Sequence, residues 1–245
     1  FSAVSVPVTV NLTPGAYSSV GKTTAGTSTL ANLTTSLDAV IEKVIGTAAA
    51  DILQGNLANN SFTGGAGDDV IDGAAGIDTL MLTSPRSAYA LGKTGTGFTV
   101  KDGVGSDGTD TVSSVERLVF SDGFKLALDL DGHAGQVAKL LGATLGKSGV
   151  SNPAFVGIGL GLLDGGMGYE ALANAIMNAL GKTTAADALT LLWTNLVGSA
   201  PDPAQVSGIV ATLGNPGVGA LTVLAADLPL NAELIGLVGL ADHGL

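Results

Sequence analysis

A nine-residue repeat between Gly46 and Met81 constrains the fold of this 245-residue chain more than any other feature. Four consecutive units, GTAAADILQ, GNLANNSFT, GGAGDDVID and GAAGIDTLM, each begin with glycine. The sixth position of each unit is polar, and the eighth is large and apolar. A fixed period with these two phases is typical of a structural repeat in which every unit adds one short strand to a stack. The sixth positions are Asp51, Asn60, Asp69 and Asp78, and the eighth positions are Leu53, Phe62, Ile71 and Leu80.

The residue types in this unit indicate a cation site. Glycines at positions one, two and four permit the positive φ angles and the close backbone approach of a tight turn. Carboxylate and carbonyl oxygens are the ligands that calcium prefers, about six to eight of them around each ion. Two units make one coil, so loops eighteen residues apart stack, and we expect one or two calcium ions between stacked loops. The predicted metal-site residues are Asp51 with Asp69 and Asn60 with Asp78, together with Gly46, Ala48, Gly64, Ala66, Gly73 and Ala75.

The run resembles the RTX (repeats-in-toxin) nonapeptide, G-G-x-G-x-D-x-U-x, where U is large and apolar. The third unit matches it at every defined position, and the fourth lacks only the second glycine. The first two units are degenerate, with Ala49 and Ala58 at the fourth position and Asn60 at the sixth. The resemblance implies a calcium-binding parallel β-roll and export through a bacterial type I secretion channel. The alternative interpretation is a Gly/Asp-rich surface loop.

We predict an α+β chain with two segregated parts. Residues 1–131 are expected to form an RTX-type parallel β-roll with short strands and a hairpin that turns at SDG (121–123). In the loop KDGVGSDGTD (101–110), Asp102, Asp107 and Asp110 suggest either a further ion site or a solvated turn, and we interpret it as a turn. Residues 132–245 are expected to form an all-α helical bundle, because apolar residues fall there at helical spacing. The expected helices are 133–146, 153–164, 168–180, 184–198, 203–213, 216–227 and 230–241.

The second half resembles a helical domain that often follows RTX repeats, through the phrase LLWTNLVGSAPDPAQ (191–205). Its tail, LPLNAELIGLVGLADHGL (228–245), is similar to the ends of type I secreted proteins, where the export signal lies. Trp193 is predicted to belong to the core. The chain opens FSAVSVPVTVNL, with neither an initiator methionine nor a signal peptide, so it looks like part of a longer protein.

Composition narrows the functional classes. The formal charge of −11 disfavours nucleic acid as a partner, and the absence of cysteine suits an export route that does not depend on oxidation. Charged residues make up only 13% and the mean hydropathy is +0.46, yet the apolar stretches, such as 154–163, are too short to span a membrane. Either the chain buries extra surface against copies of itself, or it is a well-packed monomer with a Ser/Thr/Asn coat.

The motif search predicts that the chain is not an enzyme. His133 and His243 have no partner at metal-ligand spacing, and neither a cysteine nor a G-x-S-x-G motif is present. We therefore expect a secreted, calcium-binding structural module of a bacterial surface layer, adhesin or filament, which folds on calcium binding after export. Its expected partners are calcium and copies of itself or other cell-surface components. The alternative is the non-catalytic part of an exported RTX enzyme or toxin.

Overall fold

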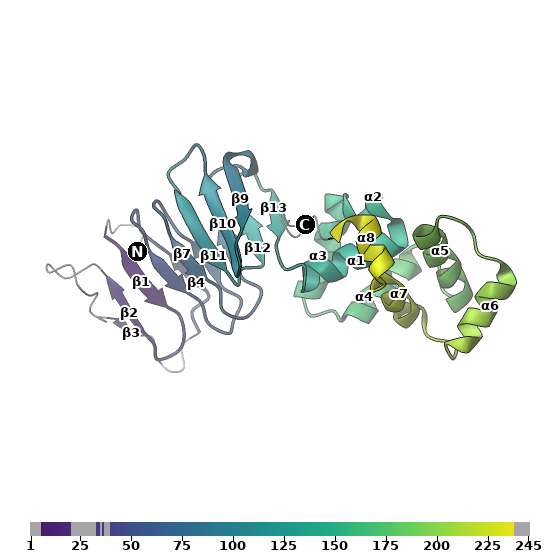
Figure 1. Ribbon diagram of the computed structural model, residues 1–245. Helices are drawn as coiled ribbons and strands as arrows, with labels where there is room; N and C mark the ends of the chain where they lie inside the picture. The colour runs from purple at the N-terminus through teal and green to yellow at the C-terminus, as the bar shows by residue number, and fades with distance from the viewer. Residues whose placement is uncertain (1–5, 21–32, 35, 37–39, 238–245) are drawn as a thin grey trace. The chain divides into compact units, whose positions relative to one another are not determined.

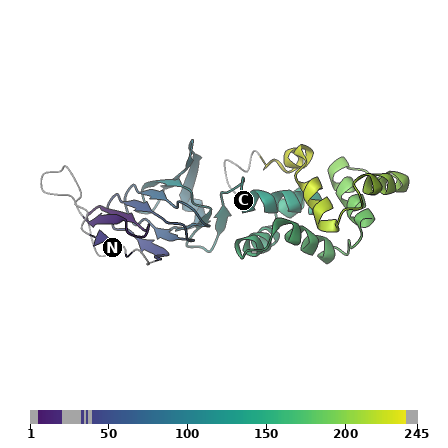
Figure 2. The ribbon, with the colours of Figure 1, turned by 90° about the horizontal axis from the view of Figure 1, so that it is seen from below.

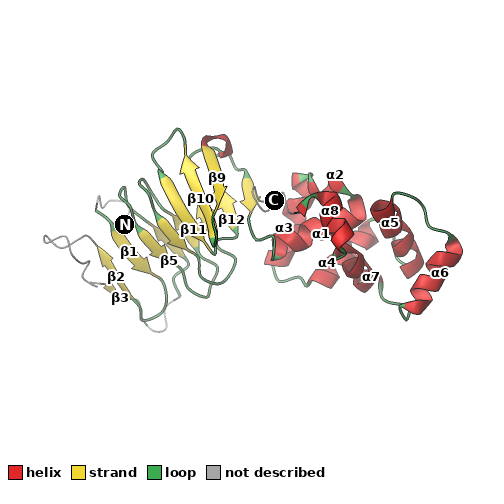
Figure 3. Ribbon diagram, in the orientation of Figure 1, coloured by secondary structure: helices red, strands yellow, loops and turns green. Residues whose placement is uncertain are grey.

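The computed structural model describes residues 6–20, 33–34, 36 and 40–237. The chain divides into two compact units, Phe1–Leu128 and Asp129–Leu245, which we call the β unit and the helical unit. Strands lie in the first and α-helices in the second (Figure 3). The predicted segregation into a β part and an α part is therefore confirmed.

The β unit contains two sheets (Figures 1 and 2). The eight-stranded sheet has the order β3-β2-β1-β5-β7-β11-β10-β9, and the five-stranded sheet has the order β13-β12-β8-β6-β4. The strands are β1 (Val8–Asn11), β2 (Tyr17–Val20), β3 (Leu33–Thr34), β4 (Lys43–Ile45), β5 (Ile52–Gln54), β6 (Ser61–Thr63), β7 (Val70–Asp72), β8 (Thr79–Met81), β9 (Tyr89–Lys93), β10 (Gly97–Asp102), β11 (Thr109–Ser113), β12 (Arg117–Val119) and β13 (Lys125–Ala127).

The repeat strands alternate between the two sheets, as two nonapeptides per coil require. Leu53 pairs with Ile71 in one sheet and Phe62 pairs with Leu80 in the other, in parallel register. The predicted parallel β-roll is nevertheless not confirmed for the unit as a whole, because both sheets are mixed. The pairs β1–β2, β2–β3, β9–β10, β10–β11 and β12–β13 are antiparallel. Antiparallel neighbours need only short turns and cover strand edges that the parallel stack would leave unpaired.

The apolar side chains at position eight form the core of the β unit. Leu53, Phe62, Ile71 and Leu80 are all 0% exposed and belong to one hydrophobic cluster. Their neighbours in each three-residue strand point outward, because successive side chains of a strand face opposite sides. Full burial of each such side chain stabilises the fold by about 1.5–3 kcal/mol. The large apolar residue at position eight is thus the inward-facing residue of each repeat strand.

The helical unit packs around its first helix. α1 contacts α2, α3, α4, α5, α7 and α8, and its buried side chains, such as Val137 and Leu140, lie in one cluster with those of the other helices. The helices are α1 (His133–Leu145), α2 (Lys147–Val150), α3 (Pro153–Asp164), α4 (Tyr169–Ala179), α5 (Ala185–Val197), α6 (Pro203–Thr212), α7 (Val218–Ala226) and α8 (Pro229–Ile235). The expected helix 153–164 has the same bounds as α3, and five others differ by one or two residues at an end. The last begins at Pro229 and reaches Ile235, and residues 238–241 of the expected helix 230–241 lie outside the described residues. The short α2 is additional.

Capping residues explain several of these helix boundaries. Thr184 accepts a hydrogen bond from the Asp187 amide at the start of α5, and Asp202 forms a capping box with Gln205 at the start of α6. Pro153, which follows the N-cap of α3, lacks only an amide that the first turn leaves free. In the described residues no single helix is long and apolar enough to cross a membrane. α7 and α8 have that length and composition only when taken together, and they are bent by 66° relative to each other.

Candidate metal centre

The glycine-rich loops that precede the repeat strands stack in two columns. In the first column, the loop of unit 46–54 lies against the loop of unit 64–72, since the Ala66 amide donates to the Thr47 carbonyl at 3.1 Å. In the second, the loop of unit 55–63 lies against that of unit 73–81, where the Ala75 amide donates to the Asn56 carbonyl at 3.2 Å. The structure thus brings together the loops that the eighteen-residue spacing pairs.

The side chains at position six run through each column as a buried spine. In the first column, the Val8 amide donates to Asp51 Oδ1, the Asp51 amide donates to Asp69 Oδ1 at 2.8 Å, and the Asp69 amide donates to Oδ1 of Asp110. In the second column, the Asn60 amide donates to Asp78 Oδ1 at 2.6 Å, and the Asp78 amide donates to Oε2 of Glu116. Each carboxylate therefore joins its own segment to the preceding member of its column.

Glycine is required where stacked backbones touch. Gly65 has a φ of 117°, and a Cβ atom there would lie 1.8 Å from the Thr47 carbonyl oxygen. Gly67 and Gly76 have φ angles of 112° and 118°. Ala74 stands where the fourth unit lacks its second glycine, and it still adopts a φ of 72°, which non-glycine residues rarely do. The loops of units three and four therefore share a positive φ at positions two and four.

The loop of the first unit closes through its own side chains. The Thr47 amide donates to Asp51 Oδ2 at 2.6 Å, and the Thr47 hydroxyl lies 3.0 Å from each carboxylate oxygen. Asp51 Oδ1 also accepts from the Val8 amide. Both oxygens of Asp51 are thus satisfied by protein donors, where we had expected them to face an ion.

Amides close the loop of the second unit in the same way. Asn60 Oδ1 accepts from the Asn56 amide at 2.9 Å, and Asn60 Nδ2 donates to the Ile41 carbonyl at 3.1 Å and to Asn56 Oδ1 at 3.2 Å. Asn56 Nδ2 donates to the carbonyls of Leu12 and Ile41. An amide nitrogen cannot ligate a cation, so Asn60 contributes at most one oxygen.

The loops of the third and fourth units leave a carboxylate oxygen without a partner. Asp69 Oδ2 and Asp78 Oδ2 are buried and have no hydrogen-bond partner. Burial, together with neighbouring carboxylates, raises the pKa of both residues to about 7. A buried anionic oxygen is costly unless a proton or a cation neutralises it. The position-six side chains of these two loops therefore have an oxygen free to bind a divalent cation, whereas those of units one and two have their oxygens in hydrogen bonds.

Most further ligands would have to be backbone oxygens. Across the described residues, no group of three His, Cys, Asp or Glu side chains could hold a metal ion. Backbone carbonyls do approach the neighbouring loops: a Cβ on Gly46 would lie 2.0 Å from the Gly64 oxygen, and one on Gly55 would lie 2.1 Å from the Gly73 oxygen. Such carbonyls are ligands of the kind that calcium accepts. The remaining predicted residues, Ala48, Ala66 and Ala75, lie in the same stacked loops.

The loop at 101–110 is a solvated turn only in part, because residues 103–106 are exposed but its three inner aspartates are not. Asp102, Asp107 and Asp110 are buried, at most 9% exposed. Asp102 accepts the amides of Val104 and Gly105, which lowers its pKa. The segment GSDGTDTVS (105–113) is a fifth nonapeptide unit, whose strand pairs in parallel with β7. This segment has the residues of the repeat: glycines at positions one and four, Asp110 at position six and Val112 at position eight. It does not follow the fourth unit directly, because residues 82–104, a 23-residue insertion, lie between them.

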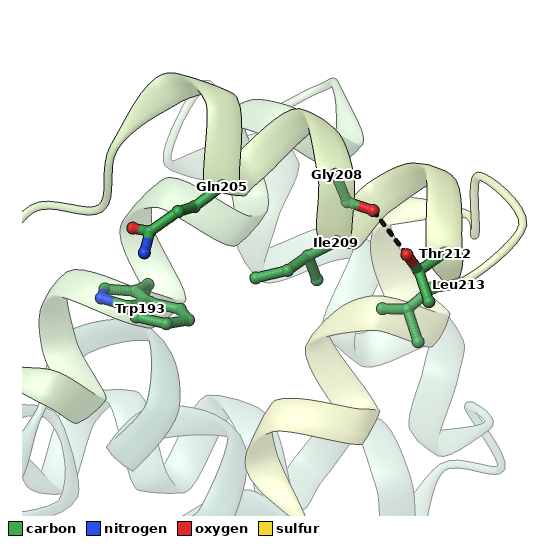
Figure 4. A pocket seen from close by; sticks show the side chains of 6 residues that line it. All are labelled: Trp193, Gln205, Gly208, Ile209, Thr212 and Leu213. Carbon is green, nitrogen blue, oxygen red and sulfur yellow. Dashed lines mark hydrogen bonds between the residues drawn. The ribbon is translucent and has the colours of Figure 1, made fainter.

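Outside these columns, the residues that the sequence singles out are the two histidines and Trp193. His133 lies at the start of α1, as expected, and its Nδ1 is 2.8 Å from Asp164 Oδ1; His243 lies outside the described residues. Trp193 is half-buried and not a full core residue, because it lines an open groove between α5 and α6 (Figure 4). None of the six side chains that line this groove is titratable: Trp193, Gln205, Gly208, Ile209, Thr212 and Leu213.

Comparison with known families agrees with the geometry of the loops. The family model described as "RTX calcium-binding nonapeptide repeat (4 copies)" matches residues 45–80. No curated protein sequence matches the chain. The matched range covers the four contiguous units and ends before the fifth. Residues 45–80 are therefore RTX calcium-binding nonapeptide repeats, and the helical unit follows them in the chain.

Proposed function

We propose that this chain is a calcium-dependent structural module of a secreted bacterial protein. The observation that carries the proposal is the pair of buried, unpartnered oxygens, Asp69 Oδ2 and Asp78 Oδ2, inside glycine turns of the matched repeat. Calcium, when bound, would neutralise the negative charge of these two buried carboxylates. Its ligands would be Asp69 and Asp78 with backbone carbonyls of the stacked loops.

The same residues explain a dependence of folding on the ion. Without calcium, burial and, after it, the repulsion of neighbouring carboxylates raise the pKa values of Asp69 and Asp78. Extracellular calcium modules bind with dissociation constants of about 10⁻⁴–10⁻³ M, so the repeats stay loose in a calcium-poor cytosol. They then fold outside the cell, where binding and folding are coupled.

Exposed apolar side chains support self-association over a role as an enzyme tail. α3 carries Phe155, Ile158 and Leu162 at helical spacing, and Ile158 is 62% exposed. The net charge of −11 opposes contact between copies, but charged residues make up only 13% of the chain, so an apolar patch can be covered without burying many charges. A surface layer, adhesin or filament is the kind of assembly that such a module serves.

Calcium titration and mass measurement test both parts of this proposal. We expect calorimetry to show millimolar-range or tighter calcium binding, and light scattering to show larger assemblies in calcium than in EGTA. Ile158→Asp is expected to reduce assembly, whereas the control Val197→Asp, at an exposed apolar site on α5, is not. Absence of calcium binding would refute the module. Calcium binding by a strict monomer would refute the assembly role and favour the non-catalytic part of an exported enzyme or toxin.

A further inference from the structure

We propose that the fifth unit builds a further calcium site with the third, between the loops 64–69 and 105–110. This inference rests on the proposed calcium binding and adds a site that lies outside the matched range 45–80. Its side-chain ligands are Asp69 and Asp110, and backbone oxygens of the two loops complete it. We call it the inter-repeat site.

Strand register places the two loops as a repeating pair. β11 pairs with β7 through Val112 and Ile71, in the same parallel sense as β5 pairs with β7 through Leu53 and Ile71. Loop 105–110 therefore follows loop 64–69 in the same column in which the latter follows loop 46–51, and in both pairs the amide of the earlier aspartate donates to Oδ1 of the later one. The chain separation is 41 residues in place of 18, because the β9–β10 hairpin is inserted before the fifth unit.

Direct contacts hold the two loops together. The Gly67 amide donates to the Ser106 carbonyl at 3.2 Å, and the Thr109 amide donates to Asp68 Oδ1 at 2.7 Å. Gly108 has a φ of 77°, and a Cβ atom there would lie 2.4 Å from the Gly67 carbonyl oxygen. The backbones are thus close enough that no side chain fits between them.

One of the two loops of the inter-repeat site holds a buried carboxylate oxygen that has no hydrogen-bond partner. Asp69 is 1% exposed; its Oδ1 accepts from the Asp51 amide, and its Oδ2 has no partner. A Cβ on Gly64 would lie 2.2 Å from this Oδ2, so the oxygen lies within the turn of its own loop. Asp110 binds the Asp69 amide through Oδ1 at 3.0 Å, which sets a second carboxylate beside the first.

The inserted hairpin fixes the loop without supplying a cation. Asp107 Oδ1 accepts from the Thr83 hydroxyl at 2.6 Å, and Oδ2 accepts from the Tyr89 hydroxyl. Asp107 therefore anchors loop 105–110 to the segment between β8 and β9. Among the described contacts of the loop, no Lys or Arg side chain pairs with the carboxylates of Asp69 and Asp110. A bound cation would therefore neutralise them.

Calcium stoichiometry of the full chain tests the inter-repeat site. Native mass spectrometry and calorimetry are expected to show one calcium ion fewer per chain for Asp110→Asn than for the parent. The matched control is Asp122→Asn, which makes the same charge change in the exposed turn between β12 and β13. Unchanged stoichiometry in Asp110→Asn would overturn the inference while leaving the proposed function intact. Absence of calcium binding by the parent would overturn both.

Amide exchange of the parent chain provides a test that does not depend on a variant folding. Peptides covering 64–72 and 105–113 are expected to gain protection at the same calcium concentration, because one ion orders both loops. If calcium protects 64–72 but leaves the exchange of 105–113 unchanged, the inter-repeat site is wrong.

Discussion

Replacement of Thr47 tests whether a hydroxyl takes the place of an ion in the first repeat. Thr47 is buried, and its hydroxyl contacts both oxygens of Asp51 at 3.0 Å and accepts the Ala49 amide at 3.1 Å. A hydrogen bond to a charged group contributes about 1.5–3 kcal/mol, and the methyl group adds about 0.8 kcal/mol. Thr47→Ala is therefore expected to lower the free energy of unfolding of the β unit by about 2–4 kcal/mol.

Thr47→Ser is the matched control, since it keeps the hydroxyl and removes only the methyl group. We expect it to cost no more than about 1 kcal/mol. The assay is the denaturant dependence of amide exchange in a peptide that covers residues 46–54, measured over a series of calcium concentrations. It reports on the β unit alone, which a helix-dominated circular dichroism signal does not.

Two results would refute this reasoning. If Thr47→Ser costs as much as Thr47→Ala, packing of the methyl group and not the hydroxyl holds the loop. If the cost of Thr47→Ala vanishes at saturating calcium, an ion can neutralise Asp51 and the first loop is a metal site after all. The expected result is a cost that is the same at every calcium concentration at which the β unit is folded.

Three further predictions address protons, the core and the turns. Burial raises the pKa of three carboxyls from about 3.8 to about 7: Asp69, Asp78 and Asp110. Their contribution to the stability of the ion-free fold is thus fully present below about pH 4 and is lost as the pH rises through 7. Calcium must displace these protons, so its affinity by calorimetry is expected to rise about tenfold per carboxyl between pH 6 and pH 8, and a flat profile would contradict this. Phe62→Ala is expected to lower the free energy of unfolding in urea by about 3–5 kcal/mol, whereas Leu57→Ala, at an exposed site, is expected to lower it by less than about 0.5 kcal/mol. Equal losses in the two variants would contradict a core built from position eight. Gly65→Ala is expected to lower the melting temperature of the β unit and to weaken calcium binding. Its control is Gly123→Ala, which has a φ of 82° but open space around it and is expected to cost only about 1–2 kcal/mol of backbone strain. Similar losses of stability in both variants would show that the contact with Thr47 is unimportant.

Contiguous periodicity made the repeat and its core predictable. The positions of Leu53, Phe62, Ile71 and Leu80 followed from the nine-residue period alone, because each strand is only three residues long and has one inward side chain. Helix boundaries were predictable for a similar reason, since capping at Thr184 and Asp202 is local chemistry. The mixed sheets were not, because the pairing of an edge strand depends on which distant hairpin reaches it.

The fifth unit escaped prediction because an insertion broke the period. Gly105, Gly108, Asp110 and Val112 carry the correct phases, but they follow the fourth unit after the segment 82–104. A search for the unit at any separation, and not only at multiples of nine, finds it. Stacking requires only that a loop be placed in register with its neighbour in the column. A hairpin can therefore be inserted between two coils when the ends of the hairpin lie close together.

Degeneracy in the first two units has a structural explanation that the sequence pattern obscures. Thr47 and Asn56 at position two look like lost glycines, yet both donate their backbone amides to the side chain at position six. Gly65 and Ala74 at the same position have positive φ angles and leave an oxygen of Asp69 or Asp78 unpartnered. The identity of position two thus separates loops that close by hydrogen bonds from loops that need a cation. It follows that the loops at the start of the stack are closed by their own side chains, whereas under the proposed function calcium neutralises the carboxylates from residue 64 onward.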